Sequence, residues 1–236
     1  ASLQTTATRV GDEYVLNGQK SYVATLTQAR VLTVMARTDP TSRGAKGVSA
    51  LIVELPCAGA SIVEQDKKLG MFGAHYGAVV FKDCRIPAAN LVGEVEGNGF
   101  KAAMKTIDKA RLHVAALCVG AAERLIDESL AYAQRRQQFG KPIAEFQMIQ
   151  AMLADSQAEC YAARSMALDA ARMRDDGADV TLEVACCKLF ASEMVGRVAD
   201  RALQIHGASG YFGDTPIMRF YRDVRAMRIY DGTSEI

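Results

Sequence analysis

The pattern of hydrophobic and polar positions changes its period near residue 90. Before that point, apolar residues form short runs rich in β-branched and aromatic side chains, separated by glycine, proline and asparagine. Beyond it, apolar residues recur at intervals of three and four, which is the spacing of an amphipathic helix. We therefore predict a multidomain α+β protein, with a β domain over residues 1–90 and a helical domain over residues 91–236.

The first domain is predicted to consist of short antiparallel strands. Residues 13–16 and 19–23 flank Asn17-Gly18, a dipeptide that favours the two-residue turn of a β-hairpin. Further strands are expected at 31–36, 48–54, 60–65 and 78–83. Strands of this length and spacing are typical of a small antiparallel β-barrel or sandwich.

The second domain is predicted to contain four helices. Three long amphipathic segments and a shorter one are expected at about 99–137, 146–174, 181–205 and 216–227. Glycines and prolines mark the breaks between them, at Phe139-Gly140-Lys141-Pro142 and at Asp175-Asp176-Gly177. Three long helices and a shorter fourth pack most simply as an up-down four-helix bundle.

Composition narrows the classes of function. The 236 residues are 50% hydrophobic and 23% charged, as in an ordinary folded protein. Because 28 Lys and Arg oppose 27 Asp and Glu, the net charge is +1, which offers no bulk attraction to nucleic acid or an anionic membrane. This balance excludes a nucleic-acid partner from our expectations. Since no apolar run reaches the roughly twenty residues that span a bilayer, we also expect no membrane insertion.

Cysteine usage indicates a reducing compartment. The six cysteines form no C-x-x-C pair and only three histidines accompany them, so no metal site is expected. Most cysteines have apolar neighbours and are interpreted as reduced core residues. Adjacent Cys186 and Cys187 are expected on different helix faces. The first residues do not form a secretory signal, so we expect an intracellular protein of the bacterial cytoplasm or mitochondrial matrix.

Four features are candidates for chemistry, and each has a structural alternative. Gly207–Tyr211 can bring backbone amides close to a phosphate or a planar ring, but it also suits a plain turn between helices. Asp231 suits either a turn residue or, in an apolar pocket, a general base. Arg135-Arg136 can pair with a phosphate or simply complement a helix end. His206 stands alone, which favours a packed histidine over a ligand.

Taken together, these motifs resemble the acyl-CoA dehydrogenase family. The matching segments follow one order with family-like spacing: Gly11–Lys20, Phe81–Pro87, Gly97–Phe100, Ile107–Arg111, Arg136–Lys141, Gln204–Gly207, Tyr221–Asp223 and Ile229–Ile236. The resemblance implies a middle β-domain followed by a C-terminal helical bundle. Family members also carry an N-terminal helical domain and a final helix that have no match here, so we expect this chain to be part of a longer enzyme.

The resemblance also implies a flavoprotein oxidoreductase of fatty-acid β-oxidation. Such an enzyme converts an acyl-CoA thioester to the trans-2-enoyl-CoA: a carboxylate removes an α-proton while the β-hydride passes to N5 of FAD. Asp231 matches this catalytic base, which is glutamate in most straight-chain members. Electron-transfer flavoprotein is the implied electron acceptor, and a homotetramer built as a dimer of dimers is the implied assembly.

The resemblance assigns further residues to the cofactor and the substrate. The residues expected to bind FAD are Tyr22, Val23, Ala24, Arg136, Gln138, Phe139, Gln204, Ile205, His206, Gly207, Ala208, Thr233, Ser234 and Glu235. The residues expected to bind the acyl-CoA are Asp108, Arg111 and Gly232. By resemblance, Arg136 reaches the FAD pyrophosphate across a subunit interface.

Three positions depart from the family pattern. Ala24 replaces a threonine whose hydroxyl bonds the flavin, Ala208 replaces a glycine, and Asp231 is one methylene shorter than glutamate. One lost hydrogen bond is worth about 0.5–1.5 kcal/mol, and displacement of a base by about 1 Å can cost on the order of 10²-fold in rate. The alternatives are therefore an acyl-CoA oxidase, a reductase of an unusual acyl-CoA, and a non-catalytic subunit.

Overall fold

The structure, a computed structural model, describes residues 3–42, 44–64, 67–213 and 215–235. Two predicted features, the end of a strand at Gln65 and the end of the last motif at Ile236, lie outside these residues. The chain divides into two compact units, Ala1–Lys68 with Phe72–Thr106 and Leu69–Met71 with Ile107–Ile236. This division falls within a helix, and the domain boundary near residue 90 stays a prediction.

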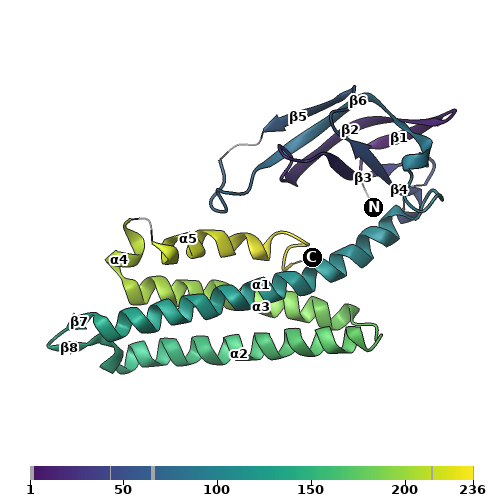
Figure 1. The fold of residues 1–236 in the computed structure, drawn as a ribbon. Helices are drawn as coiled ribbons and strands as arrows, with labels where there is room; N and C mark the ends of the chain where they lie inside the picture. Colours follow the sequence, from purple (N-terminus) through teal and green to yellow (C-terminus); the bar gives the residue numbers. More distant parts are fainter. Residues whose placement is uncertain (1–2, 43, 65–66, 214, 236) are drawn as a thin grey trace. The chain divides into compact units, whose positions relative to one another are not determined.

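The first unit is built on one six-stranded sheet with the order β4-β3-β1-β2-β6-β5 (Figure 1). The strands are β1 (Thr6–Val10), β2 (Glu13–Ala24), β3 (Val31–Arg37), β4 (Val48–Glu54), β5 (Ala60–Glu64) and β6 (Tyr76–Pro87). Only β1 and β3 pair parallel among the described strands. The α+β class is confirmed, although the sheet in the described residues does not close into a barrel.

The predicted hairpin turn at Asn17-Gly18 is wrong. Strand β2 continues through both residues, and the turn lies earlier, at Gly11, where Val10 of β1 pairs with Glu13 of β2. Gly11 has a φ of +61°, which a glycine adopts without strain. Strand β1 was not predicted, because only one of its five residues is buried and its sequence carries no apolar run.

Asn17 and Gly18 instead form an irregularity within β2. The pairing of β2 with β6 shifts between Leu16 and Gly18, and the Asn17 amide group donates to the carboxylate of Asp83 at 3.1 Å. Gly18 has a φ of +133°, and a Cβ placed on it would lie 2.8 Å from the Cα of Thr5. This glycine therefore permits close approach of two backbones.

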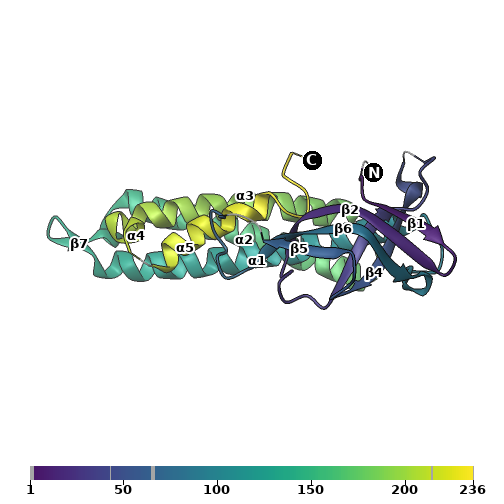
Figure 2. The same cartoon turned by 90° about the horizontal axis from the view of Figure 1, so that it is seen from above.

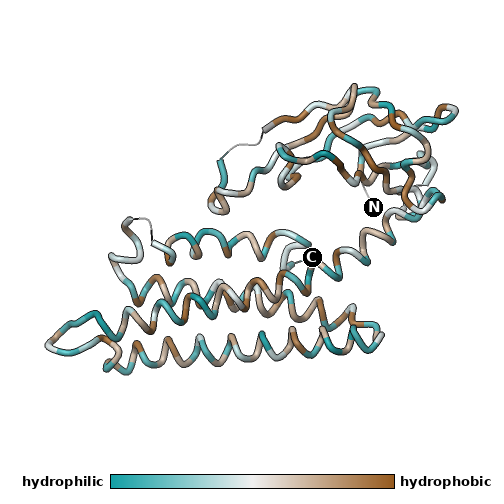
Figure 3. The backbone as a smooth tube through the Cα atoms, in the orientation of Figure 1, coloured by the Kyte–Doolittle hydropathy of each residue, from teal (hydrophilic) through white to brown (hydrophobic). Residues whose placement is uncertain are grey.

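Apolar side chains from alternate strand positions form the core of the first unit. The largest of them that are fully buried include Tyr14, Leu16, Leu51 and Phe81. Figure 3 shows hydrophobic and hydrophilic positions interleaved along the strands and helices. The hydroxyl of Tyr14 donates to Glu96 at 2.5 Å, which satisfies the polar end of this core residue.

The second unit is built on three long helices, α1 (Gly99–Arg135), α2 (Gln147–Asp175) and α3 (Thr181–His206), which lie side by side in Figures 1 and 2. Its shorter elements are α4 (Ala208–Tyr211), α5 (Pro216–Asp223), the 3₁₀ helices η3 (Ile143–Glu145) and η4 (Val224–Arg228), and the β7 (Gln137–Gln138) and β8 (Lys141–Pro142) hairpin. The 3₁₀ helices η1 (Ala45–Gly47) and η2 (Ala88–Asn90) belong to the first unit. The predicted helices are confirmed. Helix α1 begins in the first unit and continues into the second.

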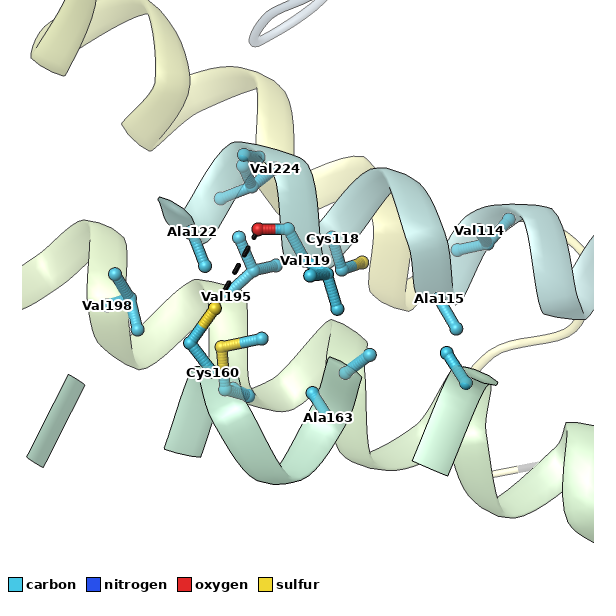
Figure 4. Packing of buried hydrophobic residues seen from close by; sticks show 14 of the residues in the cluster. Val114, Ala115, Cys118, Val119, Ala122, Cys160, Ala163, Val195, Val198 and Val224 are labelled. Atoms are coloured by element: carbon cyan, nitrogen blue, oxygen red, sulfur yellow. Dashed lines mark hydrogen bonds between the residues drawn. The ribbon is translucent and has the colours of Figure 1, made fainter. Parts of the chain in front are cut away.

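Small and β-branched side chains pack between these helices (Figure 4). The cluster includes Val114, Ala115, Cys118, Val119 and Ala122 of α1, Cys160 and Ala163 of α2, Val195 and Val198 of α3, and Val224 of η4. Full burial of one valine or leucine side chain stabilises a fold by about 1.5–3 kcal/mol. This core fixes the helices that carry the residues described next. In the described part of the chain, no helix has an apolar stretch long enough to cross a membrane.

Candidate active site

The turn after η4 carries the predicted base, Asp231. The φ angles of Asp231 and Gly232 are +54° and +93°, so both residues have left-handed backbone. Glycine adopts this conformation freely, and aspartate tolerates it better than most residues. The Ser234 amide donates to the carbonyl of Arg228 at 3.2 Å, which closes the turn. Asp231 is thus a turn residue with a half-buried side chain, and this position is compatible with its candidate role as a base.

A buried lysine of α3 contacts this turn. Lys188 is only 4% exposed, and its ammonium group donates to the carbonyl oxygen of Gly232 at 2.6 Å. Burial lowers the pKa of Lys188, and the neighbouring carboxylate of Asp231 acts in the opposite direction. A buried cation is unfavourable unless polar or charged groups compensate it. The turn compensates Lys188 with a hydrogen-bond acceptor, the Gly232 carbonyl, and with the nearby negative charge of Asp231.

Lys188 was missed in the sequence analysis. It lies four residues after Val184 and three before Ala191, and both of these residues are fully buried. Lysine at such a position was a detectable signal, because lysine is almost never buried without a partner. The partner itself could not be found in this way, since Gly232 lies 44 residues further along the chain.

Arg111 of α1 lies on another side of the same turn. A Cβ placed on Gly232 would lie 3.7 Å from the Nη2 atom of Arg111, and no other heavy atom of the described neighbours lies within 4 Å of it. The Arg111 guanidinium also pairs with Asp108, one helical turn earlier, at 3.4 Å. The structure therefore brings Asp108, Arg111, Asp231 and Gly232 together, with Lys188 as the unpredicted member.

The last described residues continue away from this cluster. Thr233 and Glu235 are exposed, while the hydroxyl oxygen of Ser234 is buried and has no hydrogen-bond partner among the described residues. The backbone amide of Glu235, followed by the Thr233 hydroxyl, holds the pKa of the Glu235 carboxyl below its usual value. A buried oxygen without a partner is rare in folded proteins, so Ser234 is a candidate contact for a ligand.

A second group of predicted residues lies at the end of α1. Arg136 and Gln138 are exposed in the connection to α2, and Phe139 is 91% exposed with a φ of +52°. Tyr132 of α1 stacks on His206 of α3 at a centroid distance of 4.3 Å, and its hydroxyl bonds Ser209 at 3.2 Å. The stretch from Gln204 to Ala208 therefore lies beside the same end of α1.

Within that stretch, the side chains divide between core and surface. Ile205 is buried, and His206 is 9% exposed with its Nδ1 atom 2.8 Å from the carbonyl oxygen of Ala202. His206 is thus buried and hydrogen-bonded within the helical unit. Gln204, Gly207 and Ala208 are exposed, so they present polar and backbone groups to solvent.

The two groups are far apart along α1. From Arg111 to Arg135, the last residue of the helix, the rise of 1.5 Å per residue gives about 36 Å. An extended cofactor of ordinary size cannot touch both groups within one chain. The structure thus does not unite all predicted cofactor-binding residues at a single place in the helical unit.

The remaining predicted residues lie at the end of β2 in the first unit. Tyr22 is 79% exposed with a φ of +59°, and Val23 pairs with Gly77 of β6 after a shift in register. Ala24 is exposed and has no hydroxyl, but the next residue, Thr25, has one, which donates to the Ala24 carbonyl at 2.8 Å.

A cavity of about 710 Å³ opens elsewhere on the helical unit, between α3 and the α5–η4 segment. Most of its lining residues are charged: Glu193, Arg197, Asp200, Arg201, Arg222, Arg225 and Arg228, together with Leu69, Gly196, Tyr221 and Val224. None of the predicted catalytic, cofactor or substrate residues lines it. Its position therefore does not contribute to the candidate site around Asp231.

Comparison with known proteins identifies the same family for both parts of the chain. Residues 1–84 match the acyl-CoA dehydrogenase middle domain, and residues 97–236 match the acyl-CoA dehydrogenase C-terminal domain. The chain is 48% identical over 225 residues to acryloyl-CoA reductase (NADH) of Anaerotignum propionicum, covering 95% of this chain and 57% of that protein.

Two further similarities agree with this family assignment. The chain is 38% identical over 234 residues to subunit CarC of the caffeyl-CoA reductase-Etf complex of Acetobacterium woodii, covering 99% of this chain and 61% of that subunit. The solved structure of butyryl-CoA dehydrogenase from Megasphaera elsdenii matches with a TM-score of 0.94 and 38% identity, over 98% of this chain and 60% of that one. The chain thus spans less than two thirds of the length of each of these proteins.

Proposed function

The chain belongs to the acyl-CoA dehydrogenase family, and on this premise we propose that the protein is an FAD-dependent oxidoreductase of acyl-CoA thioesters. Asp231 is its catalytic base. The observation that supports this most strongly is the position of Asp231 on a closed turn, whose next residue, Gly232, accepts a hydrogen bond from buried Lys188 and lies beside Arg111. A base on such a turn is held in one place, which proton abstraction from carbon requires.

The described residues fit FAD with one exception. Arg136 is exposed just beyond the end of α1, where Tyr132 bonds Ser209 of α4, and an exposed guanidinium suits a pyrophosphate. The unpartnered oxygen of Ser234 suits a polar group of the cofactor. Ala24 is the exception, and the Thr25 hydroxyl beside it is the available substitute. We assign FAD binding to Tyr22, Val23, Ala24, Arg136, Gln138, Phe139, Gln204, Gly207, Ala208, Thr233, Ser234 and Glu235, and to the backbone of Ile205 and His206, whose side chains are buried.

Bound FAD would supply the hydride acceptor for the β-carbon of the substrate. The carboxylate of Asp231 takes the α-proton when an acyl-CoA is oxidised, and its conjugate acid returns that proton when an enoyl-CoA is reduced. The backbone amide of Asp231 donates to the thioester carbonyl oxygen, where negative charge develops. Asp108, Arg111 and Gly232 line the path of the CoA moiety.

A reductase is the second candidate function. It is favoured by the 48% identity to a protein named acryloyl-CoA reductase (NADH) and by the similarity to a caffeyl-CoA reductase subunit. Both directions use the same proton position, so the residues around Asp231 serve either one. The short aspartate, one methylene shorter than glutamate, accommodates an acyl group that comes closer to the turn.

Partners and location follow from the same premise. Electron-transfer flavoprotein is the proposed electron carrier, supported by the Etf complex to which the similar CarC subunit belongs. A homotetramer is the proposed assembly, supported by the separation of Arg136, just beyond the end of α1, from the cluster around Asp231. An intracellular, reducing location is supported by the cysteines, none of which forms a disulfide in the described residues.

Anaerobic spectroscopy of the full-length flavoprotein tests the proposal. A panel of saturated acyl-CoAs is added to the oxidised protein, and the corresponding 2-enoyl-CoAs are added to the chemically reduced protein. We expect at least one saturated thioester to bleach the flavin absorbance and its enoyl product to restore it. The faster direction distinguishes a dehydrogenase from a reductase, and oxygen consumption identifies an oxidase. Absence of any spectral change in both directions contradicts the proposal and favours a non-catalytic subunit.

A further inference from the structure

We propose that Lys188 is a positioning residue for Asp231: it holds the carbonyl of Gly232 and thereby fixes the direction of the Asp231 carboxylate. The proposal rests on the proposed function, because it assumes that Asp231 is the base. Lys188 acts through the turn and does not contact the reacting atoms.

The geometry around Gly232 supports this role. The ammonium of Lys188 donates to the carbonyl oxygen of Gly232 at 2.6 Å, a short charge-assisted hydrogen bond. Lys188 starts from a core position of α3 and is 4% exposed, so its side chain has little freedom to leave this acceptor. A rigid helix thus holds the peptide group between Gly232 and Thr233, one residue after Asp231.

The turn needs such support because its backbone conformation is unusual. Asp231 has a φ of +54°, which is uncommon for any residue other than glycine. Unusual backbone conformations persist only where the surrounding structure holds them. The hydrogen bond from the Ser234 amide to the Arg228 carbonyl closes the turn from its own chain segment, whereas Lys188 holds it from another helix.

Charged and titratable groups also interact with Lys188 through space. They are Arg111 and Cys118 on α1, Glu193 on its own helix, and Asp231 on the turn. The carboxylate of Glu193 already pairs with Arg228 at 2.7 Å. The carboxylate of Asp231 therefore attracts the Lys188 ammonium through space, and this attraction becomes stronger when a bound thioester excludes water.

Substitution of Lys188 in the full-length flavoprotein tests the proposal. Lys188→Met keeps the length and removes both the donor and the charge, while Lys188→Gln removes the charge and keeps a donor. Arg197→Met is the matched control, since Arg197 is a cation of the same helix that pairs with Glu159 away from Asp231. We expect Lys188→Met to lower kcat by about 10–100-fold, as misplacement of a base does, with little change in KM.

Two further readouts separate positioning from a purely structural role. Without the cation, the pH at which kcat is half-maximal should move upward in both Lys188 variants and stay unchanged in Arg197→Met. Hydrogen exchange of the amides of residues 231–235 should become faster in Lys188→Met. This exchange is measured without substrate and does not depend on activity. If Lys188→Met does not fold, Lys188→Gln is judged by the same readouts.

The outcomes distinguish this proposal from the proposed function. If wild-type protein bleaches with an acyl-CoA and Asp231→Asn does not, while Lys188→Met keeps the wild-type kcat, pH profile and exchange rates, only the role of Lys188 is wrong. A lower melting temperature of Lys188→Met, without a change in its pH profile or in kcat, also overturns the proposed positioning role. If the wild-type protein reacts with no acyl-CoA or enoyl-CoA, both proposals fail.

Discussion

At the scale of single residues, differences in burial give the cysteine thiols different reactivities. Cys186 is exposed, whereas its neighbour Cys187 is buried on the other face of α3, as predicted from helix geometry. Burial raises the pKa of the Cys118 thiol to about 12, although nearby Lys188 acts in the opposite direction. Burial, followed by a hydrogen bond with Cys57, raises the pKa of Cys84 to about 12 as well.

These differences predict the order of alkylation. Since the thiolate is the reactive form, a thiol with a raised pKa remains protonated and unreactive near neutral pH. We expect iodoacetamide at about pH 8 to modify Cys186 first in the folded protein, while Cys84 and Cys118 react only after unfolding. Peptide mass spectrometry over a time course measures this order. Modification of Cys118 as fast as Cys186 in the folded protein would contradict the buried position assigned to it.

At the scale of secondary structure, glycine, proline and asparagine guided the predictions of helix ends and turns, with different success. Helices α1, α2 and α3 were predicted because their apolar spacing is long and is bounded by glycine and proline. The hairpin failed for a different reason. Asn17-Gly18 has the sequence of a turn, but Gly18 is required by the nearness of Thr5, a contact between segments that local sequence does not reveal.

Two glycine variants test this interpretation of β2. Gly18 and Gly11 both have positive φ, at +133° and +61°. A Cβ added at Gly18 would meet a backbone atom of Thr5 within 3 Å, whereas a Cβ added at Gly11 would meet nothing within 4 Å. Gly11→Ala should therefore cost about 1 kcal/mol of unfolding free energy, from the left-handed backbone alone. Gly18→Ala should cost about 1–3 kcal/mol more, through overpacking against Thr5 and because a φ of +133° is less accessible to alanine than +61°.

Denaturant unfolding of the two variants against wild type measures this difference. Equal destabilisation by the two substitutions would mean that backbone conformation, rather than close approach to Thr5, explains the glycine at position 18.

At the scale of the whole molecule, the predicted site residues belong to separate places. Resemblance identified the residue types, and the structure groups Arg111 with Asp231, but Arg136 follows the end of α1, which lies about 36 Å of helix from Arg111. Sequence could not reveal this division, because linear order does not tell whether two motifs serve one site or two. The arrangement is consistent with a cofactor site shared between copies of the chain.

A mixing experiment tests the shared site. Arg136→Ala and Asp231→Asn should each be inactive alone, the first through the cofactor and the second through the base. If Arg136 serves the neighbouring subunit, a mixed pair contains one site with both native residues, so co-expression should restore part of the activity. Mixed oligomers that remain as inactive as either parent would show that both residues serve the same site of one chain.

The central claim is that Asp231 is the base, and its most direct test is the anaerobic rate of flavin bleaching by a reactive acyl-CoA. Asn has the shape of Asp but cannot accept the α-proton. We expect Asp231→Asn, with FAD bound as in wild type, to lower this rate by on the order of 10²–10⁴-fold. An unchanged rate in Asp231→Asn would contradict the account, because another group would then have to remove the proton.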